Sequence, residues 1–238
     1  MPRVSQQFRA LAVDYDDTLA TCGSVDPAVL DALNRLKASG LRLLLVTGRE
    51  LDDLRRVFPA LPIFDRVVAE NGGVLHRPDT GDVRALCGAP SQRFLDLLRA
   101  RNVVPLSVGQ VIVSTREPQE VRVLEAIREL GLELEIIFNK GAVMILPSGV
   151  NKATGLRHAL AELKLQAARV VAMGDAENDH AFLEACGYGV AVANAIPALK
   201  EHASLVTSGG AGAGVIEVVE RLLSDGFGLA PKPPSAGL

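Results

Sequence analysis

The sequence lacks several features that mark whole classes of protein. It contains no tryptophan, and aromatic residues make up only 4% of its 238 residues. No stretch approaches the ~18 continuous apolar residues of a membrane span. Scarce aromatic side chains also remove the stacking platforms of single-strand binders and the interfacial belts of membrane proteins. We therefore expect no membrane and no single-stranded nucleic acid among the partners.

Charge and cysteine usage narrow the class further. A formal net charge of −3 provides no broad basic field for a nucleic-acid backbone. The three cysteines, Cys22, Cys87 and Cys186, are widely spaced and form no C-x-x-C pair, so neither a disulfide framework nor a zinc site is indicated. The first residues contain no apolar signal segment. We expect a cytoplasmic protein, monomeric or homodimeric, that binds a small molecule.

Apolar runs that end in polar loops recur along the chain. Residues 8–13 stop at Asp14, and residues 41–46 stop at Thr47. Between them, residues 27–40 have helical spacing, with an aspartate and a proline at the start and a glycine at the end. This alternation predicts an α/β fold with a doubly wound, Rossmann-like parallel sheet, whose ligands gather at the carboxyl ends of the strands.

The alternation of single strands and helices stops after Leu75, which predicts an inserted domain. We assign residues 1–75 and 148–226 to the catalytic core, 76–147 to a smaller α+β cap, and 227–238 to a flexible tail. Within the cap we expect helices at 91–101 and 118–131, and strands at 110–115, 133–138 and 142–146. The last two strands flank Asn139-Lys140-Gly141. Asn139 and Lys140 could reach an anionic tail of the substrate, but the string already suffices as a hairpin turn, which is the preferred interpretation.

Several predicted strand ends carry groups that suit phosphoryl chemistry. Mg²⁺ prefers hard oxygen ligands, a phosphoryl group needs donors for its oxygens, and covalent transfer needs a carboxylate nucleophile. Each residue alone has an ordinary alternative, such as a helix cap or a solvated first-turn side chain. The set is Asp14, Asp16, Thr47, Gly48, Lys152, Asp175 and Asp179.

Together these motifs resemble the haloacid dehalogenase (HAD) superfamily, and the insertion resembles the cap of its Cof-like, subclass IIB phosphatases. The resemblance covers about residues 8–224. The motifs, in order, are Asp14-Tyr15-Asp16-Asp17-Thr18, Thr47-Gly48-Arg49, Gly149-Val150-Asn151-Lys152 and Gly174-Asp175-Ala176-Glu177-Asn178-Asp179, with Glu70-Asn71-Gly72 as a further similar turn.

The resemblance implies a Mg²⁺-dependent phosphatase for a small phosphorylated metabolite, such as a sugar phosphate. Asp14 would attack phosphorus, and Asp16 would protonate the leaving oxygen and then activate water. Asp14, the Asp16 backbone carbonyl and Asp175 would bind Mg²⁺. Asp17 is a departure, because the commonest family pattern has glycine there.

The remaining motif residues receive supporting roles from the same resemblance. Thr47, Gly48, Lys152 and Asn178 would bind the phosphoryl group, and Asp179 would lie behind the metal ligands. Outside this set, Arg49 and Asn71 could contact the substrate, although a surface arginine and a turn asparagine explain them equally well. The glycine-rich segment 208–214 is interpreted as a connector rather than a phosphate loop.

Four other hypotheses remain. The first is a phosphotransferase or phosphomutase, which would pass the phosphoryl group to a sugar hydroxyl. The second is a non-catalytic module that binds a phosphorylated ligand. A signalling receiver shares the strand-end acids, but the inserted cap and the length of 238 residues disfavour it. Metal-independent dehalogenation is disfavoured because it would not need the Asp16 and Asp175 arrangement. We also predict cap closure about residues 73–78 and 147–150.

Overall fold

The large sheet places the predicted strand-end residues at one edge. The computed structural model describes residues 7–224, so the predicted tail lies outside the described residues. The sheet has eight strands in the order β12-β11-β10-β1-β2-β3-β4-β5, with β4 and β5 antiparallel to their neighbours. Its strands are β1 (Ala10–Val13), β2 (Arg42–Val46), β3 (Arg66–Ala69), β4 (Val74–His76), β5 (Val83–Ala85), β10 (Val170–Gly174), β11 (Tyr188–Ala191) and β12 (Leu205–Val206).

Register brings the functional loops together. The parallel pairing sets Val13 opposite both Leu45 of β2 and Met173 of β10. The three strands therefore end at the same level, and the residues that follow them share one edge of the sheet. All four residues of β1 are buried, which explains its continuous apolar run. The predicted doubly wound, Rossmann-like sheet is confirmed.

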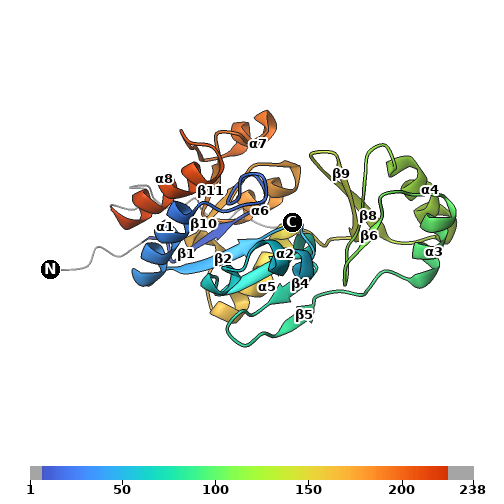
Figure 1. The fold of residues 1–238 in the computed structure, drawn as a ribbon, viewed down its shortest axis with the longest axis horizontal. Coiled ribbons are helices and arrows are strands. Elements are labelled where there is room, and N and C mark those ends of the chain that lie inside the picture. Colours follow the sequence, from blue (N-terminus) through green and yellow to red (C-terminus); the bar gives the residue numbers. More distant parts are fainter. Residues whose placement is uncertain (1–6, 225–238) are drawn as a thin grey trace.

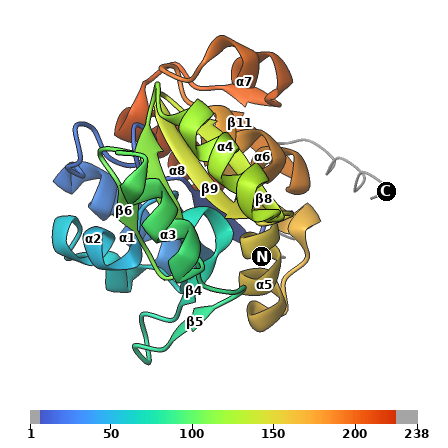
Figure 2. The same cartoon turned by 90° about the vertical axis from the view of Figure 1, so that its right-hand side faces the viewer.

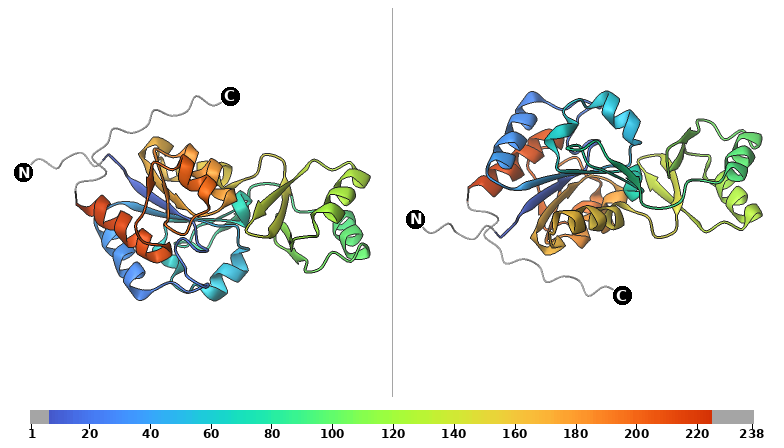
Figure 3. Two further views of the ribbon diagram at one scale, coloured as in Figure 1. Left: turned by 90° about the horizontal axis from the view of Figure 1, so that it is seen from above. Right: turned by 90° about the horizontal axis from the view of Figure 1, so that it is seen from below.

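Helices cover both faces of this sheet. Figure 3 shows α1 (Pro27–Ala38) and α8 (Ala211–Leu223) on one face and α5 (Lys152–Leu163) and α6 (His180–Ala185) on the other. The short helices α2 (Leu51–Val57) and α7 (Pro197–His202) flank the sheet. Asp26 caps α1 by accepting a hydrogen bond from the Ala28 amide at 2.8 Å, as its sequence predicts. No helix among residues 7–224 has the length and apolarity needed to cross a bilayer.

The connector prediction for residues 208–214 is wrong in part. Helix α8 begins at Ala211, so the second half of the glycine-rich segment forms its first turn. Gly212 and Gly214 are buried, and a Cβ atom on Gly212 would lie 2.6 Å from Val29. Close packing against α1, rather than flexibility, therefore accounts for this glycine.

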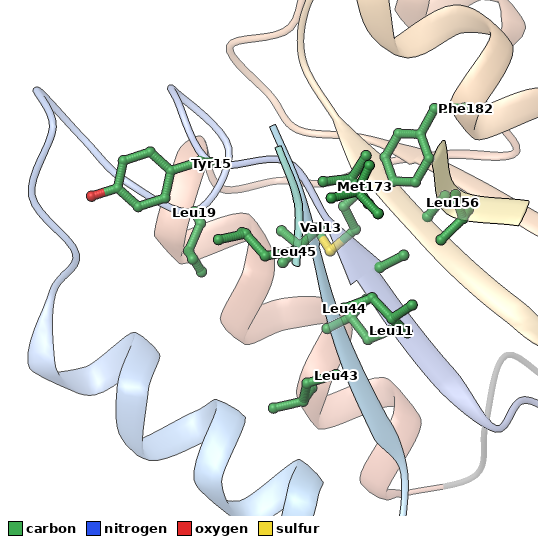
Figure 4. Packing of buried hydrophobic residues seen from close by; sticks show 14 of the residues in the cluster. Leu11, Val13, Tyr15, Leu19, Leu43, Leu44, Leu45, Leu156, Met173 and Phe182 are labelled. Atoms are coloured by element: carbon green, nitrogen blue, oxygen red, sulfur yellow. The ribbon is translucent and has the colours of Figure 1, made fainter. Parts of the chain in front are cut away.

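The core is built from apolar side chains that project from the central strands onto these helices. Figure 4 shows Leu156 of α5 and Phe182 of α6 close to Met173 of β10. Leu19, in the loop after β1, lies elsewhere in this cluster, near Leu45. All five side chains are buried, with at most 1% of their surface exposed. Such dense packing fixes the strand ends on which the site depends.

A second, smaller sheet forms the cap. Its antiparallel strands follow the order β6-β7-β9-β8, and α3 (Gln92–Ala100) and α4 (Glu120–Leu130) cover one face with a separate apolar core. Seen from the cap side in Figure 2, these helices lie in front of the strands, so the sheet faces the larger domain (Figure 1). The strands are β6 (Ser107–Val108), β7 (Val113–Arg116), β8 (Leu134–Asn139) and β9 (Ala142–Pro147).

The domain boundary stays a prediction, which the strand pairing refines at one end. β4 pairs with β3 and β5 pairs with β4, so both belong to the large sheet. We predicted neither strand, and we began the cap at residue 76. The pairing favours a boundary after Ala85, and a hinge there rather than at residues 73–78.

Candidate active site

Three buried carboxylates meet at the carboxyl edge of the large sheet. Asp14 follows β1, Asp175 follows β10, and Asp179 ends the short 3₁₀ helix η4 (Glu177–Asp179). Their side-chain oxygens lie within 4.8 Å of one another, and each residue is at most 4% exposed. Carboxylates that are this close together and buried from solvent stay ionised only when cations lie nearby.

Lys152 supplies one of these cations. Its ammonium donates to Asp14 at 2.6 Å and to Asp179 at 2.7 Å, and its side chain is 1% exposed. Burial alone would lower the pKa of Lys152, but the charges of Asp14 and Asp179 more than offset it and raise that pKa above its ordinary value. The capping box of Asn151 and Thr154 starts α5 at Lys152 and so fixes its position.

Asp179 organises the loop that carries Asp175. Its second carboxylate oxygen accepts the backbone amides of Asp175 at 2.9 Å and Ala176 at 3.0 Å. Both oxygens of Asp179 are thus occupied by donors from its own domain, whereas Lys152 contacts one oxygen of Asp14. This arrangement fits a carboxylate that lies behind a metal site and holds a ligand in place.

Asp175 is held by one residue from the core and one from the cap. The Thr18 hydroxyl donates to it at 2.9 Å, and the ammonium of Lys140 contacts its other oxygen. Lys140 also contacts Asp17 at 3.0 Å. Burial raises the pKa of Asp175 above its ordinary value, and the hydrogen bond from Lys140 partly offsets this rise.

The contacts of Lys140 with Asp17 and Asp175 were not predicted, because from sequence a turn was preferred to a substrate contact. The turn is present: Lys140 and Gly141 join β8 to β9 with positive φ angles of 46° and 81°. No local pattern, however, signals that the hairpin reaches the core.

The acidic cluster fits a divalent cation. Asp14 and Asp179 share the single positive charge of Lys152, and Asp17 and Asp175 share that of Lys140. Each group therefore remains one positive charge short. Burial raises the pKa of Asp14 well above its ordinary value even with Lys152 beside it, so a further cation would hold it ionised. The available donors are hard carboxylate oxygens, which Mg²⁺ prefers.

Thr47 and Gly48 follow β2 beside this cluster. Thr47 is fully buried, and its hydroxyl accepts the Arg49 amide at 3.1 Å. It does not cap the next helix, because α2 begins at Leu51 and has no side-chain cap. A Cβ atom on Gly48 would lie 2.7 Å from the Met144 methyl and 3.5 Å from the Asn178 amide nitrogen. Gly48 therefore lies directly beneath cap strand β9.

Asn71 and Asn178 form a buried amide pair in the same region. The Asn178 side-chain amide donates to the Asn71 carbonyl oxygen at 3.0 Å. Among the described residues, the Asn71 nitrogen and the Asn178 oxygen have no hydrogen-bond partner. Asn71 has a φ of 53° and is fully buried, so it is not an ordinary surface turn residue. Free buried polar atoms are costly, and a bound ligand would satisfy them.

Arg49 contacts Asp16 in this structure. Its guanidinium donates to both carboxylate oxygens, with Nε 2.8 Å from Oδ2 and Nη2 2.7 Å from Oδ1. It also pairs with Asp53 at 2.6 Å and lies 5.4 Å from the centre of the Tyr15 ring. The hydrogen bonds that Arg49 donates to Asp16 raise the pKa of Arg49. Arg49 thus positions the carboxylate that we assigned to acid–base chemistry.

Glu70 is a structural anchor that sequence reasoning did not identify. Its buried carboxylate accepts the backbone amides of Gln110 at 3.0 Å, Val111 at 2.7 Å and Ile112 at 3.0 Å. Glu70 itself has a φ of 51°, which is rare for a side chain of this size. It fixes the chain before β7 to the turn that carries Asn71. An acidic residue directly before Asn-Gly at a strand end was the only sequence signal.

Comparisons with known proteins agree with this geometry. The family model of haloacid dehalogenase-like hydrolases matches residues 11–106 and 100–219. Phosphoglycolate phosphatase of Methanothermobacter thermautotrophicus is 34% identical over 225 residues, which cover 91% of this chain and 99% of that protein.

Solved structures show the same fold. A phosphatase of the HAD superfamily from Bacteroides thetaiotaomicron has a TM-score of 0.75 at 22% identity, and the match covers 93% of this chain and 97% of the other. A sugar phosphatase of HAD subclass IIB has a TM-score of 0.73 at 19% identity, with 90% and 98% covered.

Proposed function

This chain belongs to the haloacid dehalogenase-like hydrolases and is a phosphoric monoester hydrolase of the HAD type, and we propose that it is Mg²⁺-dependent and works through a phosphoaspartate on Asp14. The proposed substrate is a small phosphorylated metabolite. The Methanothermobacter relative is a phosphoglycolate phosphatase, and the match covers 99% of that protein, so 2-phosphoglycolate is the first candidate. The observation that carries the proposal is the buried Asp14-Lys152-Asp179 bridge beside Asp175.

The first chemical step uses Asp14. Its free carboxylate oxygen attacks phosphorus, the bond between phosphorus and the ester oxygen breaks, and Asp16 gives its proton to that oxygen. Lys152 donates to Asp14 at 2.6 Å and so keeps the nucleophile's other oxygen in place. Mg²⁺, held by Asp14, Asp175 and the Asp16 backbone carbonyl, would reduce the repulsion between the carboxylate and the phosphoryl oxygens.

The second step returns Asp14 to its starting state. Asp16 takes a proton from water, the water oxygen attacks phosphorus, and the bond to Asp14 breaks to release phosphate. For both steps Asp16 must leave or share its contact with Arg49, which now binds both of its oxygens. Arg49 is therefore a positioning residue for the acid–base group.

Most of the donors proposed for the phosphoryl oxygens follow strands near the one that Asp14 follows. We assign this role to the Thr47 hydroxyl, the Gly48 amide and the Lys152 ammonium, and we add the unpartnered Asn71 amide nitrogen. Asn178 orients Asn71 through its 3.0 Å hydrogen bond and offers an oxygen of its own. These groups are fixed before substrate arrives, which is what transition-state stabilisation requires.

The test is phosphate release from a panel of phosphorylated glycolates, sugars and nucleotides, with Mg²⁺ or with a chelator. Metal-dependent release from a small substrate, with 2-phosphoglycolate among the best, is the expected result. A phosphorylated or isomerised sugar without phosphate release would favour a phosphotransferase or phosphomutase instead. Tight binding without any product would favour the non-catalytic module.

A further inference from the structure

The tip of the β8–β9 hairpin brings one cation from the cap into the core. The ammonium of Lys140 contacts Asp17 and Asp175, and its backbone amide donates to Glu177 at 3.2 Å. Glu177 belongs to the same loop as Asp175. The hairpin is thus held at the edge of the site by both its main chain and its side chain.

A turn alone does not require this lysine. Its φ of 46° lies in the left-handed region, where glycine or asparagine costs less than a long side chain. The turn needs a positive φ at this position as well as at Gly141, whose φ is 81°, and asparagine or glycine would satisfy that need. The side chain is therefore retained at some conformational cost, which indicates that the ammonium has a role of its own.

The present partners of Lys140 change when a metal binds. Asp175 is a proposed Mg²⁺ ligand, and a divalent cation on it supplies the charge that Lys140 supplies now. The other partner, Asp17, has a side chain that is 51% exposed, so that ion pair is weak. A metal-loaded site would leave the ammonium close to the reaction centre with only a solvated partner.

A second cap residue, Met144, limits the size of a substrate that fits beside Lys140. Met144, on β9, places its methyl group against Gly48, where a Cβ atom would be only 2.7 Å away. The cap thus presents an apolar methyl group above the proposed phosphate-binding residues and a cation beside the proposed metal ligands. This pairing suits a short substrate with a second negative charge.

We propose that Lys140 is a specificity-determining residue: it leaves Asp175 when metal binds and pairs with a carboxylate on the leaving group of the substrate. The inference rests on the proposed function and deepens it, because such a pair would favour 2-phosphoglycolate over neutral esters of the same size. Asp17, which stands where the family usually has glycine, competes for the same ammonium.

Equilibrium binding to the Asp14→Asn enzyme, which should not turn over, tests the inference directly. The two ligands are 2-phosphoglycolate and 2-hydroxyethyl phosphate, which is similar in size but lacks the carboxylate. With Mg²⁺ present, adding Lys140→Met should weaken phosphoglycolate binding roughly 10- to 100-fold and hydroxyethyl phosphate binding less than about 3-fold. Lys200→Met, on α7 outside the site, is the matched control and should alter neither.

Two further measurements distinguish a role of Lys140 in substrate recognition from one in which it only holds the cap against the core. Without substrate, Lys140→Met should bind Mg²⁺ more tightly than wild type, because the competing ammonium is gone. Asp17→Gly should strengthen phosphoglycolate binding, and its φ of 56° suits glycine. Equal weakening of both ligands by Lys140→Met, or no weakening, would overturn the inference. Selective binding without turnover in the wild type would instead contradict the proposed function and leave the role of Lys140 standing.

Discussion

The ammonium of Lys152 lies 2.6 Å from Asp14 and 2.7 Å from Asp179, and all three side chains are buried. One cation from the start of α5 therefore joins the end of β1 to the loop after β10. The same bridge holds the proposed nucleophile in place and stabilises the meeting point of these elements. Activity and folding stability consequently depend on one residue.

Replacing Lys152 with methionine should reduce both the folding stability and the activity. The substitution leaves two buried carboxylates without their cation, which costs about 3–5 kcal/mol of unfolding free energy at neutral pH. Phosphate release should fall below detection. Urea denaturation and a phosphate assay check the two effects, with Lys200→Met as the control. Unchanged stability would show that the bridge is not formed in solution.

Glu70→Ala should weaken the attachment of the cap. Three backbone amides, those of Gln110, Val111 and Ile112, would lose their shared acceptor, at a cost of about 2–4 kcal/mol. Glu50→Ala, which removes an exposed contact to Ser107, is the matched control and should cost much less. Hydrogen exchange at residues 110–112 measures the local effect. Unaltered exchange there would contradict the anchor role.

Gly72→Ala should be among the most destabilising single changes in the core. Gly72 has a φ of 109°, and a Cβ atom there would lie 2.0 Å from the Asn151 carbonyl oxygen. The clash falls on the backbone that begins α5, so no side chain can give way. Gly81→Ala is the control, because its φ of 80° carries strain but nothing lies within 4 Å of a new Cβ. We expect about 1 kcal/mol for Gly81→Ala and a loss at least about twice as large for Gly72→Ala, measured by urea denaturation.

Glu162 should contribute to stability in a pH-dependent way. Hydrogen bonds from Arg77 and then Arg66 lower the pKa of this glutamate from 4.5 to about 2. Since the folded-state pKa is depressed, the stabilisation is complete above about pH 5 and disappears as pH falls toward 2. Glu162→Gln should cost about 1–2 kcal/mol at pH 7 and progressively less in acid.

The control for this pH profile is Glu220→Gln, whose pair with Arg35 lies in solvent. Thermal unfolding at several pH values makes the comparison. A difference between wild type and Glu162→Gln that stays constant from pH 7 to pH 3 would contradict the assignment.

The sequence predicts the parallel core well, because long-range order there follows from local pattern. The buried apolar run of β1 ends directly before Asp14, so the end of the run marks the end of the strand. Asp26 and Pro27 likewise mark the start of α1, as expected. Parallel strands then bring their ends together without further information. The juxtaposition of Asp14, Asp175 and Asp179 is a consequence of this register.

The remainder depends on contacts that have no local pattern. All three residues of β5 are exposed, so no buried apolar run predicts this strand. Its strand conformation depends instead on pairing with β4. The contacts of Lys140 and Glu70 cross between the core and the cap, and Asp16, which contacts Arg49, lies in the loop after another strand. Residue type at these positions indicates charge but not partner. From sequence, Arg49 therefore fitted a substrate contact and a surface arginine equally well, and a plain turn was preferred for Lys140.

In the proposed mechanism, Asp14 carries the phosphoryl group during turnover. The direct measurement is acid quenching of the enzyme a few milliseconds after mixing with substrate and Mg²⁺, followed by mass spectrometry of the peptide that contains Asp14. We expect a peptide heavier by one phosphoryl group, absent from Asp14→Asn and absent when a chelator replaces the metal. Phosphate release from wild type with this peptide never modified, or undiminished release by Asp14→Asn, would contradict it.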